Sequence, residues 1–210
     1  MKILIACEES GRVREAFRAK GHEVWSCDTE PSRDRSLFHI QGDVLDILDD
    51  GWDMMIGFPP CRYLCNSGVQ YLHTEPGRWE KMIKARDFYN LLWAANIQRV
   101  CLENSIPHRY GIGKNYTQTI QPYDFGEDAS KRTCLKLRGL PKLRNTKYFP
   151  PRIVNGKKRW GNQTDSGQNK LGPSPDRAKI RATTYQGIAD AMADQWGSPR
   201  KQAEFVFFLS

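Results

Sequence analysis

A cysteine follows two prolines at the end of the segment Gly57–Cys61, directly after a short apolar run. The thiolate of cysteine is the strongest nucleophile among ordinary side chains, and a stiff backbone before it reduces the entropy lost in aiming the sulfur. A lone cysteine is otherwise a common core residue. Because Pro59 and Pro60 end the preceding strand, we predict that Cys61 lies at the mouth of a ligand crevice and acts as the nucleophile of a covalent reaction.

A glutamate and an asparagine, Glu103 and Asn104, follow a second apolar run at 99–102. A carboxyl group near a nucleophilic thiol can protonate or hydrogen-bond a ring nitrogen while the sulfur adds to the ring. Addition at C6 of cytosine makes C5 carbanion-like and able to accept a methyl group from a sulfonium donor. Cys61 and Glu103 together therefore indicate an attack on a pyrimidine ring. The alternative is that Glu103 only begins a helix before Pro107.

The first turn of the chain holds one glycine and consists of Cys7, Glu8, Glu9, Ser10 and Gly11. It lacks the three glycines that bring a backbone against a pyrophosphate, which favours a ligand with adenosine but without phosphates. Asp28 follows this turn by roughly twenty residues, where such folds place an acid that binds the ribose hydroxyls. Asp43 could accept a hydrogen bond from an adenine amino group. For both aspartates, a turn-capping role is an equally good interpretation.

Apolar periodicity outlines the elements that must hold these residues, because short apolar runs predict strands and spacings of three and four predict helices. Strands are expected over Lys2–Cys7, His22–Cys27, Phe38–Ile40, Asp53–Gly57 and Arg99–Leu102. Helices are expected over Gly11–Lys20, Glu75–Ala95 and Gln186–Trp196. The first helix should bury Val13, Ala16 and Phe17. In the long helix the residues available for the core are Trp79, Met82, Ile83, Phe88, Leu91 and Leu92.

The later part of the chain changes character. Thr117–Phe125 and Thr133–Leu137 predict paired strands across a turn at 126–128, and residues 150–178, rich in Pro, Gly, Asn, Lys and Ser, predict a long loop. The earlier alternation of strands and helices indicates parallel pairing with right-handed crossovers. We therefore expect one α/β domain over 1–210, a Rossmann-like doubly wound sheet with a β-hairpin and a basic, loop-rich extension at 138–180.

The candidate site residues share one position in this fold. In a doubly wound sheet the ligand binds at the carboxyl ends of the parallel strands. The first turn, Asp28, Cys61 and Glu103 each follow such an end. One crevice is therefore expected to collect them.

The charge of the chain favours a polyanionic partner. The 210 residues carry a net charge of +8 at neutral pH. Basic residues gather between Lys131 and Arg159, interleaved with aromatic ones such as Tyr148 and Phe149. This pattern favours a nucleic-acid partner over a merely solvated basic face.

Compartment and metal binding follow from the apolar runs and the cysteines. The apolar runs are strand-sized, so no membrane span is expected, and the N-terminus is typical of a first strand and not of a signal peptide. The expected compartment is the cytoplasm, where the six cysteines would be free thiols. Cys61 and Cys65 lack a second Cys or His pair at zinc-finger spacing, so no metal is expected.

Two segments carry a family resemblance. Phe58-Pro59-Pro60-Cys61 resembles the Pro-Cys motif of DNA cytosine-5 methyltransferases. Leu102-Glu103-Asn104 resembles their Glu-Asn-Val motif, with Ser105 in place of valine. Over nearly its full length the chain looks like a compact, phage-type group of these enzymes without a separate target-recognition domain. The segments that carry this wider resemblance are 61–68, 121–126, 131–135, 139–141, 176–179 and 187–193.

The resemblance implies transfer of a methyl group from S-adenosylmethionine to C5 of cytosine in DNA, on a fold of the S-adenosylmethionine-dependent methyltransferase type. It implies Cys61 as the nucleophile, Glu103 as the residue that contacts N3 and, by a looser match, Arg132 near the catalytic pocket. The cofactor contacts that it implies are Cys7, Glu8, Glu9, Ser10, Gly11, Asp28, Asp43, Phe58 and Pro59.

Two features depart from the family pattern. The glycine-rich first motif is reduced to Glu8-Glu9-Ser10-Gly11, and only about 138–180 is spare for target recognition. A short basic loop grips phosphates but reads little sequence. A homodimer or a protein partner would supply the missing target recognition, and a single-stranded or nucleotide substrate would not need it. The alternative functions are a related pyrimidine modification of RNA or nucleotides, and a non-catalytic nucleic-acid-binding protein on the same scaffold. For a phage-encoded protein the compartment is the host cytoplasm.

Overall fold

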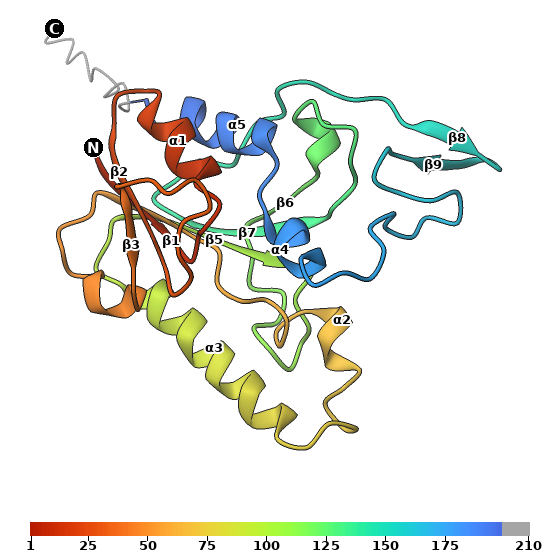
Figure 1. Cartoon of the computed structure of the whole chain (residues 1–210), viewed down its shortest axis with the longest axis horizontal. Coiled ribbons are helices and arrows are strands. Elements are labelled where there is room, and N and C mark those ends of the chain that lie inside the picture. The colour runs from red at the N-terminus through yellow and green to blue at the C-terminus, as the bar shows by residue number, and fades with distance from the viewer. Residues whose placement is uncertain (199–210) are drawn as a thin grey trace, which may run out of the picture.

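Seven strands form the main sheet of the computed structural model, which describes residues 1–198 (Figure 1). They are β1 (Lys2–Ala6), β2 (Glu23–Asp28), β3 (His39–Gln41), β4 (Met54–Gly57), β5 (Arg99–Ser105), β6 (Gln118–Ile120) and β7 (Thr133–Arg138). Their order is β3-β2-β1-β4-β5-β7-β6; the first five are parallel, and β7 is antiparallel to both neighbours. Residues 199–210 of the predicted domain lie outside the described residues.

Helices cover both faces of the sheet. Figure 1 shows α1 (Arg12–Arg18) and α5 (Gln186–Trp196) on one face and α3 (Arg78–Ala94) on the other. In β1 the alternation of side chains serves both layers, because Ile3 and Ile5 pack with α1 and α5 while Leu4 packs in the cluster that includes α3. The shorter elements are α2 (Asn66–Val69), α4 (Arg177–Ala182) and two 3₁₀ turns, η1 (Val44–Ile47) and η2 (Pro122–Asp124).

The predicted Rossmann-like doubly wound α/β sheet with a β-hairpin is confirmed. The order 3-2-1-4-5 is that of a doubly wound nucleotide-binding sheet, and its switch point lies between β1 and β4. The burial expected in α1 is also confirmed, since Val13, Ala16 and Phe17 all belong to the core.

The core face of the long helix was predicted only in part. Met82 and Leu92 are buried as expected and Phe88 is half-buried, and the buried stripe also includes Tyr89. This stripe is narrow, because the segments around η1 and residues 64–72 share that side of the core with the helix. The predictions for three residues at its flanks are therefore wrong: the exposed side chains are Trp79, Ile83 and Leu91.

Two predictions for the later region need correction. The predicted strand 117–125 is short, because Pro122 cannot donate to a ladder and starts a 3₁₀ turn instead. The predicted loop 150–178 contains a second, two-stranded sheet of β8 (Arg152–Val154) and β9 (Lys157–Arg159), and it runs into α4. Within residues 1–198, no helix is both long and apolar enough to cross a membrane.

A test of the packing between α5 and the 122–127 turn uses Gly187. A Cβ at this position would lie 1.9 Å from the carbonyl oxygen of Phe125. Alanine usually favours a helix over glycine by about 1 kcal/mol, but here the clash should dominate. We expect Gly187→Ala to lower the free energy of unfolding, measured by urea denaturation, by about 1–3 kcal/mol.

Gly172→Ala is the matched control for this variant. A Cβ at Gly172 meets no atom within 4 Å, so the free energy of unfolding should hardly change. A Gly187→Ala variant at least as stable as the wild type would contradict the packing described here.

Candidate active site

The ends of β4 and β5 leave the sheet side by side. Their parallel register pairs Gly57 with Leu102. A Cβ at Gly57 would lie 2.8 Å from Cδ2 of Leu102, so a larger residue here would displace the end of that side chain. The Phe58 amide then donates to the Ala6 carbonyl at 2.9 Å, which directs the prolines and Cys61 across the carboxyl edge of the sheet.

The loops after β4 and β5 are bonded to each other and fix the position of Cys61. The Cys61 carbonyl accepts from the amides of Leu64 and Cys65 at 2.9 and 3.1 Å, which closes a tight turn. Main-chain hydrogen bonds at 2.8 and 3.0 Å then join residues 64 and 66 to residues 108 and 106 of the other loop. As a result the half-buried Cys61 Sγ lies 3.3 Å from Oγ of Ser105, the last residue of β5.

Cys61 and Cys65 form a coupled pair of thiols. The pKa of Cys61 is raised by its hydrogen bond with Cys65, by burial and by the nearby carboxylate of Glu103, against a lowering by the Ser105 hydroxyl. The pKa of Cys65 is lowered to about 5 by hydrogen bonds from Cys61, Ser67 and nearby backbone amides. Cys61 therefore holds its proton more tightly than an exposed cysteine does, and Cys65 releases its proton more readily.

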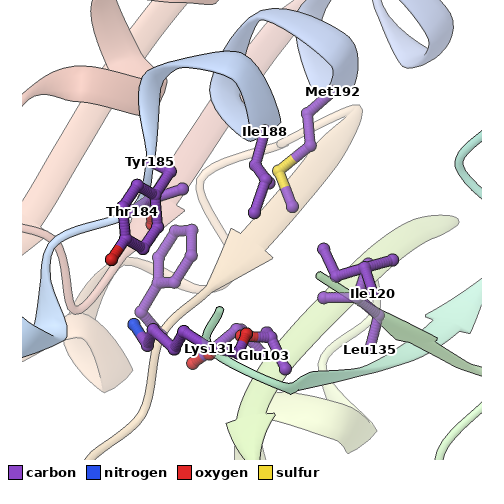
Figure 2. A pocket seen from close by; sticks show the side chains of 10 residues that line it. Glu103, Ile120, Lys131, Leu135, Thr184, Tyr185, Ile188 and Met192 are labelled. Carbon is purple, nitrogen blue, oxygen red and sulfur yellow. The ribbon is translucent and has the colours of Figure 1, made fainter. Parts of the chain in front are cut away.

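Glu103 faces a small cavity on the side of α5. Burial raises the pKa of its carboxyl group, and both the charge of Lys131 and a hydrogen bond from Thr133 oppose this rise. Figure 2 shows Glu103 and Lys131 close together, with Ile188 and Met192 of α5 on the opposite wall. The cavity volume is about 10 Å³, room for roughly one water molecule.

Residues of the first turn are engaged in holding α1. The buried Glu8 accepts hydrogen bonds from Ser10 Oγ at 2.8 Å and from the Val13 amide at 3.1 Å through Oε1, while its Oε2 has no partner within the described chain. Burial raises the pKa of this carboxyl group. Gly11 has a φ of 75° and no room for a Cβ, because the side chains of Arg14 and Asp34 approach within 2.6 Å of that position.

Glu9 bonds outward, to the segment around α4. Its carboxylate lies 2.5 Å from Arg33 and 3.9 Å from Lys179. Arg33 also donates to the Thr183 hydroxyl at 3.0 Å and to the Lys179 carbonyl at 3.2 Å. The α4 segment thus rests on the first turn and on the loop after β2.

Three more of the predicted cofactor residues lie together at the carboxyl ends of β1 to β3. Cys7 has a φ of 57°, and its amide donates to the Cys27 carbonyl at 2.7 Å. Burial and the charges of Asp28 and Asp43 raise the pKa of its thiol, which places both aspartates near it. Asp28 caps its own turn through the Glu30 amide at 3.0 Å, and Asp43 caps η1 through the Leu45 amide at 3.0 Å. The turn-capping roles are therefore real, and the cofactor roles stay predictions.

The remaining predicted residues are Phe58, Pro59 and Arg132, and they differ in their position relative to the cavity. Phe58 lines it, and Pro59 is buried directly behind. Arg132 is exposed and does not line it, whereas its neighbour Lys131 does. Sequence reasoning missed Lys131, Cys65 and Ser105 as neighbours of the two central residues. The basic pair 131–132 and the C-x3-C spacing were the available signals for the first two.

The side chains of the described residues offer no group of three or more His, Cys, Asp or Glu that could hold a metal ion. All six cysteines of the chain are free thiols, Cys7 and Cys61 half-buried and the others buried.

Comparisons with known proteins give distant structural similarities. No protein-family model matches the chain, and no curated protein is similar to it in sequence. Among solved structures, it is similar to a putative DNA modification methyltransferase from an E. coli prophage, with 15% identity and a TM-score of 0.47 over 72% of this chain and 52% of that one. It is also similar to a methyltransferase of Entamoeba histolytica, with 13% identity and a TM-score of 0.45 over 71% of this chain and 58% of that one. A third similar structure is the Dnmt2 methyltransferase of S. pombe, with 13% identity and a TM-score of 0.42 over 68% of this chain and 51% of that one. The chain spans about half the length of each.

The raised pKa of Glu103 predicts a pH-dependent stability. Because the folded state binds this proton more tightly than the unfolded chain, the contribution is fully present below the unfolded pKa, about 4.3. It is lost as the pH rises through the folded pKa. We expect Glu103→Gln, which cannot ionise, to become increasingly more stable than the wild type over that rise, in urea denaturation at a series of pH values.

Glu80→Gln, at an exposed position of α3, is the matched control and should show no such trend. A stability difference between Glu103→Gln and the wild type that does not change with pH would contradict a buried, proton-retaining Glu103.

Proposed function

We propose that this protein transfers a methyl group from S-adenosylmethionine to C5 of cytosine in DNA through a covalent adduct of Cys61. The observation that carries the proposal is the convergence of two groups. Cys61 is fixed against Ser105 at the end of the strand that holds Glu103, and Glu103 is close enough for its charge to raise the pKa of the Cys61 thiol. Thiol and carboxyl are the pair that an attack on a pyrimidine ring requires.

The residues of the chain divide the chemistry between them. The Cys61 sulfur bonds to C6 of the ring, and its proton is released to solvent. Glu103, which burial keeps protonated to a higher pH, donates a hydrogen bond to N3 and so draws electrons from the ring. S-adenosylmethionine, when bound, supplies the electrophilic methyl group for C5. Loss of the C5 proton and departure of the Cys61 sulfur then restore the aromatic ring.

The acidic character of the crevice supports a cationic cofactor. Asp28 and Asp43 act together on Cys7, and Glu8 Oε2 is buried without a partner in the described chain. A carboxylate oxygen in this state gains from an ammonium or hydroxyl donor. S-adenosylmethionine offers both and carries a sulfonium, whereas the pyrophosphate of a dinucleotide would meet like charges here.

The small cavity favours a second candidate, a nucleic-acid-binding protein that uses the same scaffold without catalysis. About 10 Å³ beside Glu103 is much less than a bound nucleobase needs. Catalysis therefore requires the walls from Phe58 and from the Tyr185 segment to move apart when ligands bind.

Labelled methyl transfer tests the proposal directly. With labelled S-adenosylmethionine and mixed-sequence DNA, the wild type should place label on C5 of cytosine, and Cys61→Ala should place none because the adduct cannot form. Parallel assays with RNA and with free nucleotides show whether the substrate is instead one of these. Label on adenine, or label that survives Cys61→Ala, would overturn the proposal. Absence of label from every substrate would favour the non-catalytic candidate.

A mechanism-based trap identifies the sulfur. DNA that contains 5-fluorocytosine should form an adduct stable to denaturing electrophoresis, because fluorine at C5 cannot leave as a proton does. Cys61→Ala should abolish this adduct. Cys65→Ala distinguishes the two neighbouring thiols and should still form it. Confirmed methylation without an adduct would refute thiol addition.

A further inference from the structure

The two strands β8 and β9 form a ribbon that projects from the body of the molecule (Figure 1). A turn of two residues joins them, and both have positive φ, 48° at Asn155 and 72° at Gly156. This is the type I′ pattern, whose twist suits a tight two-stranded hairpin and for which Asn-Gly is the preferred sequence. The tip of the ribbon is therefore locally well defined.

Two arginines hold the base of the ribbon and are not available to a partner. Arg152 donates to the carbonyls of Trp160 and Gln163 at 3.1 and 2.8 Å and to the Asp165 carboxylate at 2.8 Å. Arg159 donates to the carbonyls of Asp165 and Ser166 at 3.0 and 3.3 Å. These bonds fold residues 160–166 back against the ribbon and stiffen it.

The lysines of the ribbon, by contrast, are free. Lys157 and Lys158 are both exposed, and within residues 1–198 no carboxylate pairs with either. The register places Lys158 opposite Ile153, whose side chain is 64% exposed, so the two share one face. Lys157 lies opposite Val154, so its side chain is on the other face and the two lysines give the ribbon one cation on each face.

The ribbon is also rigidly connected to the candidate active site. The Trp160 ring stacks on Tyr123 at 4.0 Å between centroids and 9° between planes, and its Nε1 donates to the Phe149 carbonyl at 3.0 Å. Asn162 exchanges hydrogen bonds at 3.0 Å with the backbone of Ser130. The next residue after Ser130 is Lys131, which lines the cavity with Glu103. A ligand held by the ribbon is thus held in a fixed relation to the cavity.

We propose that the β8–β9 ribbon enters the major groove of duplex DNA with the face of Ile153 and Lys158 toward the base edges, and that Lys158 on this face and Lys157 on the other reach the phosphates on the two sides of the groove. The major groove, about 12 Å wide, admits a two-stranded ribbon, and an apolar side chain there can contact the thymine methyl group. The charge of the ribbon complements the phosphates, whose neutralisation supplies most non-specific affinity. This inference rests on the nucleic-acid substrate of the proposed function and narrows it to duplex DNA.

The test is the salt dependence of DNA binding by the full chain, measured by fluorescence anisotropy with a labelled mixed-sequence duplex and without cofactor. Each phosphate contact contributes about 0.9 to the slope of log affinity against log salt. We expect Lys157→Ala with Lys158→Ala to reduce this slope by about 1.8 and the affinity at 0.1 M salt by roughly 60-fold. Ile153→Ser should weaken binding at unchanged slope.

Lys81→Ala with Lys84→Ala is the matched control, because both lysines are exposed on α3. This pair should leave the slope nearly unchanged. Loss of slope in the control equal to that in the ribbon variant would overturn the inference, as would tighter binding to the single strand than to the duplex. If the ribbon variant binds duplex DNA as the wild type does and still transfers methyl groups, the inference about the ribbon is refuted and the proposed function stands.

Discussion

The parallel pairing of β4 with β5 is the constraint on which the candidate site depends. Its register sets Gly57 against Leu102, so the chain beyond β4 runs alongside the last residues of β5. The antiparallel β7 keeps β5 extended as far as Ser105, whose hydroxyl reaches the Cys61 sulfur. A shift of one residue in β5 would turn Glu103 to the other face of the sheet and separate it from the cavity. The register of β4, β5 and β7 therefore determines how Cys61 and Glu103 are aligned.

Burial keeps a proton on both groups, which favours the proposed role of Glu103 and opposes that of Cys61. It keeps a proton on Glu103, which makes this carboxyl group a hydrogen-bond donor at a pH where an exposed glutamate would only accept. It also keeps a proton on Cys61, which by itself makes the sulfur a poorer nucleophile. Cys65, whose thiolate is stabilised by hydrogen bonds from Cys61, Ser67 and backbone amides, is the more readily ionised thiol of the pair.

The sequence predicted the site residues whose position follows from the order of strands and turns along the chain. It did not predict positions that depend on contacts between separate segments. Cys61 and Glu103 could be placed because each directly follows an apolar run, and the carboxyl ends of parallel strands meet at one edge. Ser105 as the partner of Cys61 depends on two loops bonding to each other, which no periodicity reveals. The ribbon at 152–159 looked like a loop because its strands are short, lie in a segment rich in Pro, Gly, Asn, Lys and Ser, and are anchored by arginines on main-chain carbonyls. Trp79 and Ile83 have core-like residue types, but the stripe that packs on the sheet is narrower than their spacing implies.

The cover over the first turn is held mostly by charge, since Arg33 and Lys179 bridge Glu9, Glu30 and the α4 backbone at the protein surface. Counter-ions screen such bridges over about 10 Å at 0.1 M ionic strength. Added electrolyte therefore weakens the bridges that hold the α4 segment against the first turn, and the cover over that turn should loosen as ionic strength rises.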